Sequence, residues 1–94
     1  MWQTALLTFL AGILGGNAIP HFVKGITKER YPTVFGASPI VNLVAGWTGL
    51  VAAALLLHAA GVDTHAGVAA IAGPLGVLVM GLFHAGPGAF GRNP

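Results

Sequence analysis

Three long runs of apolar residues, separated by short stretches that hold the polar side chains, make up most of the 94-residue chain. Each run is about 20 residues long, the length that an α-helix needs to cross the hydrocarbon core of a bilayer. The pattern predicts an all-α membrane protein with three transmembrane helices in one domain, at about 2–19, 39–60 and 65–83. These helices leave a loop at 20–38 and a tail at 84–94.

The first predicted helix has two possible ends. Pro20 has no backbone N–H and interrupts helical hydrogen bonding, so we expect the helix to stop at Ile19 and to span roughly 27 Å. If Gly15-Gly16-Asn17 instead forms a C-terminal cap, the helix loses nearly a turn and crosses only by thinning the bilayer. The first residues lack the positive charges of a secretory signal, so we expect this helix to remain in the mature protein.

Clear start signals precede the other two helices. Ser38 is a favourable N-cap and Pro39 a favourable first helical residue, so the second helix is expected to begin there. Asp63 or Thr64 can cap the third helix, and Pro74 in its middle should kink it.

The composition identifies these helices as membrane helices. Charged residues make up 6% of the chain and hydrophobic residues 55%, whereas a soluble domain carries about a quarter charged residues. A charge at the centre of a bilayer costs at least ~2.5 kcal/mol, so a membrane favours this deficit. The four cations are too dispersed for a nucleic-acid surface. The absence of cysteine excludes disulfides and thiolate metal sites.

The basic residues predict the orientation of the helices. Loop 20–38 carries most of them and Arg92 follows the third helix, while the turn between the second and third helices carries Asp63 and no lysine or arginine. Cytoplasmic loops are enriched in lysine and arginine. We therefore expect the N-terminus outside, and loop 20–38 and the C-terminus in the cytoplasm.

Small residues gather along one side of each predicted helix, and bulky side chains lie opposite. Membrane helices associate by close packing of small residues, so these sides are the expected contact surfaces and the bulky sides should face lipid. A compact three-helix bundle and a homo-oligomer both satisfy the pattern. The glycines expected at helix contacts are Gly12, Gly16, Gly46, Gly49 and Gly73.

The loop between the first two helices contains a short amphipathic segment. Phe22, Val23 and Ile26 alternate with Lys24 and Lys28, which would let the segment lie in the headgroup layer with its apolar side down. Anionic membrane lipid would hold this loop as a rigid connector at about 1 kcal/mol per basic residue. A ligand-binding lid is the alternative. The residues expected at the headgroups are Lys24, Lys28 and Arg30.

Four polar side chains are expected at similar depth near the cytoplasmic side of the membrane. Polar residues within a membrane usually line a cavity or pair with one another, so we expect a ligand or permeation site there. In the alternative interpretation the asparagines cap helices and the histidines face headgroups. The four residues are Asn17, His21, Asn42 and His84.

The remaining polar residues form no recognisable reactive centre. His58 and His65 are separated by a turn, and their spacing is not that of a zinc site. Bis-histidine haem ligation between helices is conceivable, but nothing distinguishes it from chance. Glu29 and Asp63 are the only carboxylate residues, and they are expected on opposite sides of the membrane. We therefore expect no cofactor, no metal site and no enzymatic activity.

The stretches GNAIPHFVKGIT at 16–27 and YPTVFG at 31–36, followed by Asn42, form a distinctive pattern. They resemble the GNxxPHFxxG…PTxFG loop of small uncharacterised bacterial integral-membrane proteins. The resemblance implies a bacterial membrane protein, and it transfers no activity or residue role. The chain does not resemble the small multidrug transporters, which carry an intramembrane carboxylate and four helices, or the small fluoride channels.

Together these patterns indicate a small integral protein of the bacterial inner membrane. We expect it to associate with itself and to act as a channel or transporter through the polar site on its cytoplasmic side. The alternative is a non-catalytic accessory subunit that packs its small faces against a larger membrane complex.

Overall fold

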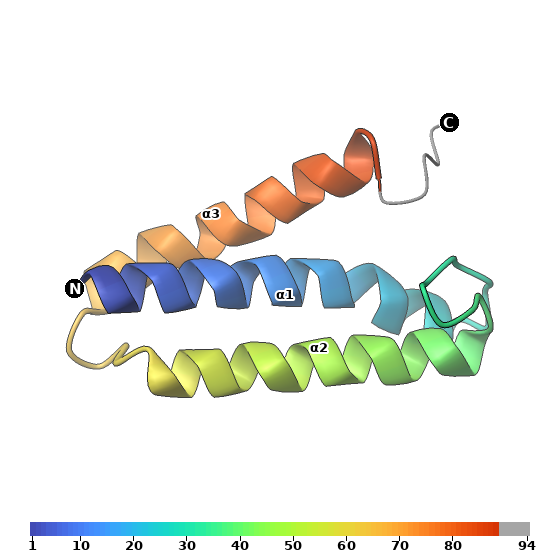
Figure 1. Cartoon of the computed structure of the whole chain (residues 1–94), viewed down its shortest axis with the longest axis horizontal. Coiled ribbons are helices and arrows are strands. Elements are labelled where there is room, and N and C mark those ends of the chain that lie inside the picture. The colour runs from blue at the N-terminus through green and yellow to red at the C-terminus, as the bar shows by residue number, and fades with distance from the viewer. Residues whose placement is uncertain (89–94) are drawn as a thin grey trace.

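A computed structural model describes residues 1–88, and within this range the chain forms three α-helices (Figure 1). They are α1 (Trp2–Ile26), α2 (Pro39–Ala59) and α3 (Ala66–Ala85). Each helix is long and apolar enough to cross a membrane, so the all-α architecture expected of a membrane protein is confirmed. Arg92 and most of the predicted tail lie outside the described residues.

The structure corrects the predicted end of the first helix. α1 continues through Pro20 for six further residues to Ile26, so the stretch predicted as an interfacial segment forms the last turns of this helix. Proline removes one helical hydrogen bond at a cost of about 3 kcal/mol. Beyond it, α1 packs directly on α2, because a Cβ atom on Gly25 would lie 2.6 Å from the backbone nitrogen of Leu43. Tertiary contact on both sides of Pro20 stabilises the helix through the interruption.

Residues 27–38 form the connection between α1 and α2. Lys28 ends α1 with a positive φ of 61°, and the N–H of Glu29 donates to the carbonyl of Lys24 at 2.9 Å, a helix ending usually built with glycine. The N–H of Tyr31 donates to the carbonyl of Ala37 at 3.1 Å, so the loop returns along itself.

The start of α2 coincides with the predicted cap. The Ser38 hydroxyl accepts a hydrogen bond from the N–H of Val41 at 3.2 Å, and Pro39 is the first helical residue. This cap satisfies one of the free N–H groups at the helix start. α3 continues through Pro74 to Ala85, two residues beyond the predicted end.

α1 is the central helix of the fold. It packs against α2 on one side and α3 on the other, and within residues 1–88 α2 and α3 do not contact each other. Figure 1 shows α3 diverging from α1 toward its C-terminal end, so the outer helices enclose an open angle. The single chain is therefore a layer of three helices with α1 in the middle, and not a closed bundle.

Glycines allow α1 to approach both neighbours closely. A Cβ atom on Gly12 would lie 2.2 Å from the carbonyl oxygen of Gly73, and one on Gly46 would lie 2.5 Å from the backbone nitrogen of Phe22. Close approach of this kind is how membrane helices gain van der Waals contact. The other predicted packing glycines also meet a neighbouring helix: Gly16 faces Met80, Gly49 faces Ala18, and Gly73 faces the carbonyl of Thr8. Gly76, which the sequence pattern did not single out, is the buried residue of α3.

Large apolar side chains cover the outside of the three helices. In water such a surface would drive aggregation, whereas in a bilayer these side chains face lipid tails. They include Leu6, Leu10, Val44, Leu55, Ile71, Leu75, Leu78 and Leu82, all exposed.

Candidate functional site

Two histidine–asparagine pairs join α1 to its neighbours. Asn17 and His21 are four residues apart and therefore lie on the same side of α1. His21 pairs with Asn42 in the first turn of α2, and Asn17 pairs with His84 in the last turn of α3. The structure thus brings the four predicted polar residues together as two pairs, which we call the polar quartet.

Asn42 makes most of the hydrogen bonds around the first pair. It is fully buried, and its Oδ1 lies 2.7 Å from Nδ1 of His21. Its amide nitrogen donates to the carbonyls of Tyr31 at 2.7 Å and Ser38 at 3.0 Å, and more weakly to that of Ala37 at 3.4 Å. Asn42 therefore ties α1, the returning loop and the start of α2 at one point.

The partners of Asn42 decide which ring nitrogen of neutral His21 carries the hydrogen. Backbone carbonyls only accept hydrogen bonds, so the amide nitrogen of Asn42 must face Tyr31 and Ser38 and its oxygen must face the imidazole. Nδ1 of His21 is consequently the donor, and Nε2 of the neutral ring keeps a free lone pair. Asn42 holds the His21 ring so that Nε2, the basic nitrogen of the imidazole, is directed away from the buried hydrogen bonds of Asn42.

The second pair is more open. Nε2 of His84 and Oδ1 of Asn17 lie 3.0 Å apart, and both residues are half-buried. Within residues 1–88, Nδ2 of Asn17, Nδ1 of His84 and Nε2 of His21 have no hydrogen-bond partner. The two imidazoles are close enough for an electrostatic interaction. An imidazole nitrogen without a partner can accept a hydrogen bond, whereas the amide nitrogen of Asn17 can only donate one.

Tyr31 belongs to the same site and was missed from the sequence. Its ring meets the His21 imidazole edge-on, with centroids 5.2 Å apart and planes at 68°, and its carbonyl receives the Asn42 amide. A backbone carbonyl carries no sequence signal. An aromatic residue directly before a proline in the loop was the only available cue.

The predicted headgroup residues lie at the end of α1 and in the loop. Nζ of Lys24 is 3.5 Å from Oε2 of Glu29, whereas Lys28 and Arg30 are exposed and have no carboxylate partner within the described range. A hydrogen bond from Thr27 and the charge of Lys24 lower the pKa of Glu29. Two cations therefore remain available in the loop between α1 and α2.

The other histidines lie at the opposite end of the molecule. His58 is exposed in the last turn of α2, and His65 is half-buried directly before α3. No group of three potential metal ligands exists among residues 1–88. A polar hollow of about 380 Å³ lies between the start of α1 and the turn that joins α2 to α3. Beside it, the Thr4 hydroxyl donates to the carbonyl of Ala60.

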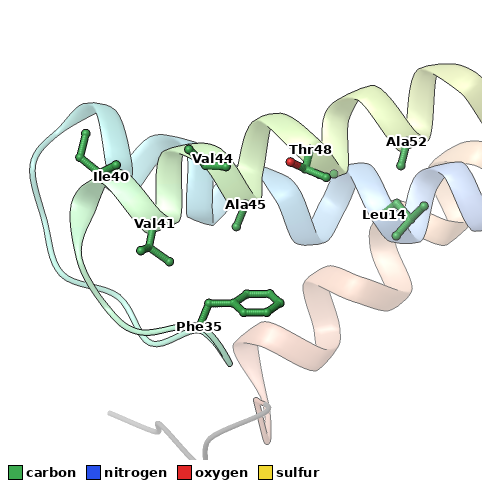
Figure 2. A pocket seen from close by; sticks show the side chains of 9 residues that line it. Leu14, Phe35, Ile40, Val41, Val44, Ala45, Thr48 and Ala52 are labelled. Carbon is green, nitrogen blue, oxygen red and sulfur yellow. The ribbon is translucent and has the colours of Figure 1, made fainter.

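An apolar groove lies along α2, with Leu14 of α1 and Phe35 of the loop also in its lining (Figure 2). Its volume is about 570 Å³. Figure 2 shows Phe35 reaching from the loop into this space, opposite Val41 and Ala45 of α2. The groove is lined by Leu14, Phe35, Ile40, Val41, Val44, Ala45, Thr48, Gly49 and Ala52.

Comparison with protein-family models, curated proteins and solved structures finds no match for the chain.

Proposed function

We propose that this small integral membrane protein associates with itself and provides a binding or permeation site for a proton, a small ion or a small polar solute. The site is the polar quartet, with Asn42 as the positioning residue. The residues that touch the bound species are His21, Asn17 and His84.

One observation supports this proposal above the others. Three half-buried residues near the loop end of the membrane helices present polar atoms without partners in the described part of the chain. Unpaired polar atoms are costly in lipid and persist where they face a cavity, water or another polar group. A second subunit or a hydrated path would supply those partners.

The arrangement is suited to transient binding. Asn42 fixes the His21 ring while leaving Nε2 free, so this nitrogen can accept a hydrogen bond from a bound species and release it again. We place the quartet on the cytoplasmic side of a bacterial inner membrane, because the cations of the adjacent loop favour that side.

Flux measurements on the purified chain in liposomes test this function. We expect wild-type protein to increase the flux of protons, of potassium ions or of glycerol, and His84→Ala and His21→Ala to abolish that increase. His58→Ala is the matched control, since His58 is an exposed histidine outside the quartet. A folded oligomer without flux in all three assays, or equal flux in the three histidine variants, would refute the proposal.

A second candidate function follows from the open packing of α3. This helix contacts only α1 within the described chain and buries a single residue, Gly76, which suits an accessory subunit covered by a larger membrane complex. Purification in mild detergent separates the candidates. A defined homo-oligomer supports the binding or permeation protein, and co-purification with a larger complex supports the accessory subunit.

A further inference from the structure

We propose that the apolar groove along α2 holds one acyl chain of an anionic phospholipid, whose headgroup is bound by Arg30 and Lys28. This inference requires membrane embedding only, and it does not depend on the function proposed for the polar quartet.

The length of the groove matches one leaflet of a bilayer. Its lining on α2 runs from Ile40 to Ala52, a rise of about 18 Å at 1.5 Å per residue. Half of the hydrocarbon core measures about 15 Å. An acyl chain that enters at the loop end would therefore reach along the groove to the middle of the membrane.

The shape of the groove suits an occupant that lies along α2. Its lining comes from α2, from Leu14 of α1 and from Phe35 of the loop, and no residue of α3 contributes to it. One hydrocarbon chain can follow this line of apolar side chains without displacing a helix.

The chemistry of the lining favours hydrocarbon. Eight of the lining residues are apolar, and the exception is Thr48. Phe35 stands at the loop end and projects into the space (Figure 2), where its ring can cover the first carbons of a chain. No group in the groove offers a charge to a polar ligand.

The charges at the mouth favour an anionic headgroup. The N–H of Tyr31 donates to the carbonyl of Ala37, three residues before Ile40, so Arg30 lies at the same end of the molecule as the start of the groove. Arg30 and Lys28 have no carboxylate partner within residues 1–88, and basic clusters next to membrane helices bind anionic lipid. The apolar groove and the basic residues of the loop are therefore both suited to an anionic phospholipid.

Native mass spectrometry of the full chain, purified in mild detergent, tests this site. The probe is an equal mixture of phosphatidylglycerol and phosphatidylcholine with identical acyl chains. We expect one tightly retained phosphatidylglycerol per chain. Arg30→Gln should lower the preference for phosphatidylglycerol about fivefold, the factor for one basic residue at an anionic surface.

Filling the groove provides the second arm of the test. Ala45→Trp occupies the space and should abolish retention of both lipids, whereas Ala54→Trp, on an exposed part of α2 outside the groove, should retain them. Phe35→Ala changes an exposed loop side chain and should speed lipid release without affecting folding, so the site remains testable if Ala45→Trp misfolds.

Three results would overturn the proposal. Unchanged retention in folded Ala45→Trp and Phe35→Ala would mean that the lipid is bound elsewhere. Equal retention of the two lipids by the wild type would exclude an anionic headgroup site. Conversion of a dimer to a monomer by Ala45→Trp, with lipid retention unchanged, would identify a second copy as the occupant.

Discussion

Replacing Asn42 with alanine should destabilise the protein more than any other single polar substitution in the quartet. Asn42 is fully buried and takes part in three short hydrogen bonds, at 2.7, 2.7 and 3.0 Å. The alanine variant loses these bonds and leaves the Tyr31 carbonyl and the His21 Nδ1 group without their partner. The variant therefore removes a contact that α1, the loop and α2 share.

The expected loss in the free energy of unfolding follows from the number of hydrogen bonds that Asn42 makes. A net hydrogen bond contributes about 1 kcal/mol in proteins generally and about 0.6 kcal/mol between membrane helices. Three bonds give a loss of about 2 to 3 kcal/mol in the free energy of unfolding. Asn17→Ala is the matched control, because Asn17 makes one hydrogen bond and is half-buried. Its loss should be at most about 1 kcal/mol.

Reversible unfolding in mixed micelles, with an increasing fraction of denaturing detergent, measures both values. The double variant His21→Ala/Asn42→Ala completes a cycle in which we expect a coupling of about 0.5 to 1.5 kcal/mol, since the two side chains contact directly. Equal losses for Asn42→Ala and Asn17→Ala, or a coupling of zero, would refute the argument that Asn42 organises this end of the fold.

Three further changes test other contacts. Gly76→Ala would place a Cβ atom 2.2 Å from a backbone oxygen of α1, so we expect a loss of about 1 to 3 kcal/mol in unfolding free energy, while Gly81→Ala, which meets open space on the same helix, should be neutral or stabilising. Lys28→Gly relieves a positive φ of 61° and should raise the unfolding free energy by about 0.5 to 1 kcal/mol; a lower value would show that the left-handed ending is not strained. The folded-state pKa of Glu29 is lowered by Thr27 and Lys24, so its stabilising effect is present above the unfolded pKa and is lost as the pH falls through the folded pKa. Glu29→Gln should therefore show a weaker decline of the unfolding midpoint on acidification than the wild type, and an identical decline would contradict the contact.

The sequence by itself determined the kind of protein and most of its elements. Three apolar runs with few charges predict helices long and apolar enough to cross a membrane, because backbone groups in lipid must be satisfied within each segment. The Ser38–Pro39 start of α2 was also predictable, since capping depends on residues that are neighbours in sequence. Helical periodicity likewise placed Gly46 on the contact side of α2, where it is buried.

Only the tertiary structure decided the end of α1 and the partners in the quartet. Local propensity stops a helix at Pro20, but contacts of Gly25 with Leu43 beyond the proline outweigh that preference. The pairing of Asn17 with His84 joins residues 67 positions apart. The amide of Asn42 donates to the backbone carbonyl of Tyr31, and a backbone carbonyl is a group that every residue has. Such choices depend on which helices lie side by side. The order of packing, with α1 in the centre, is therefore a property of the folded chain that no local sequence pattern carries.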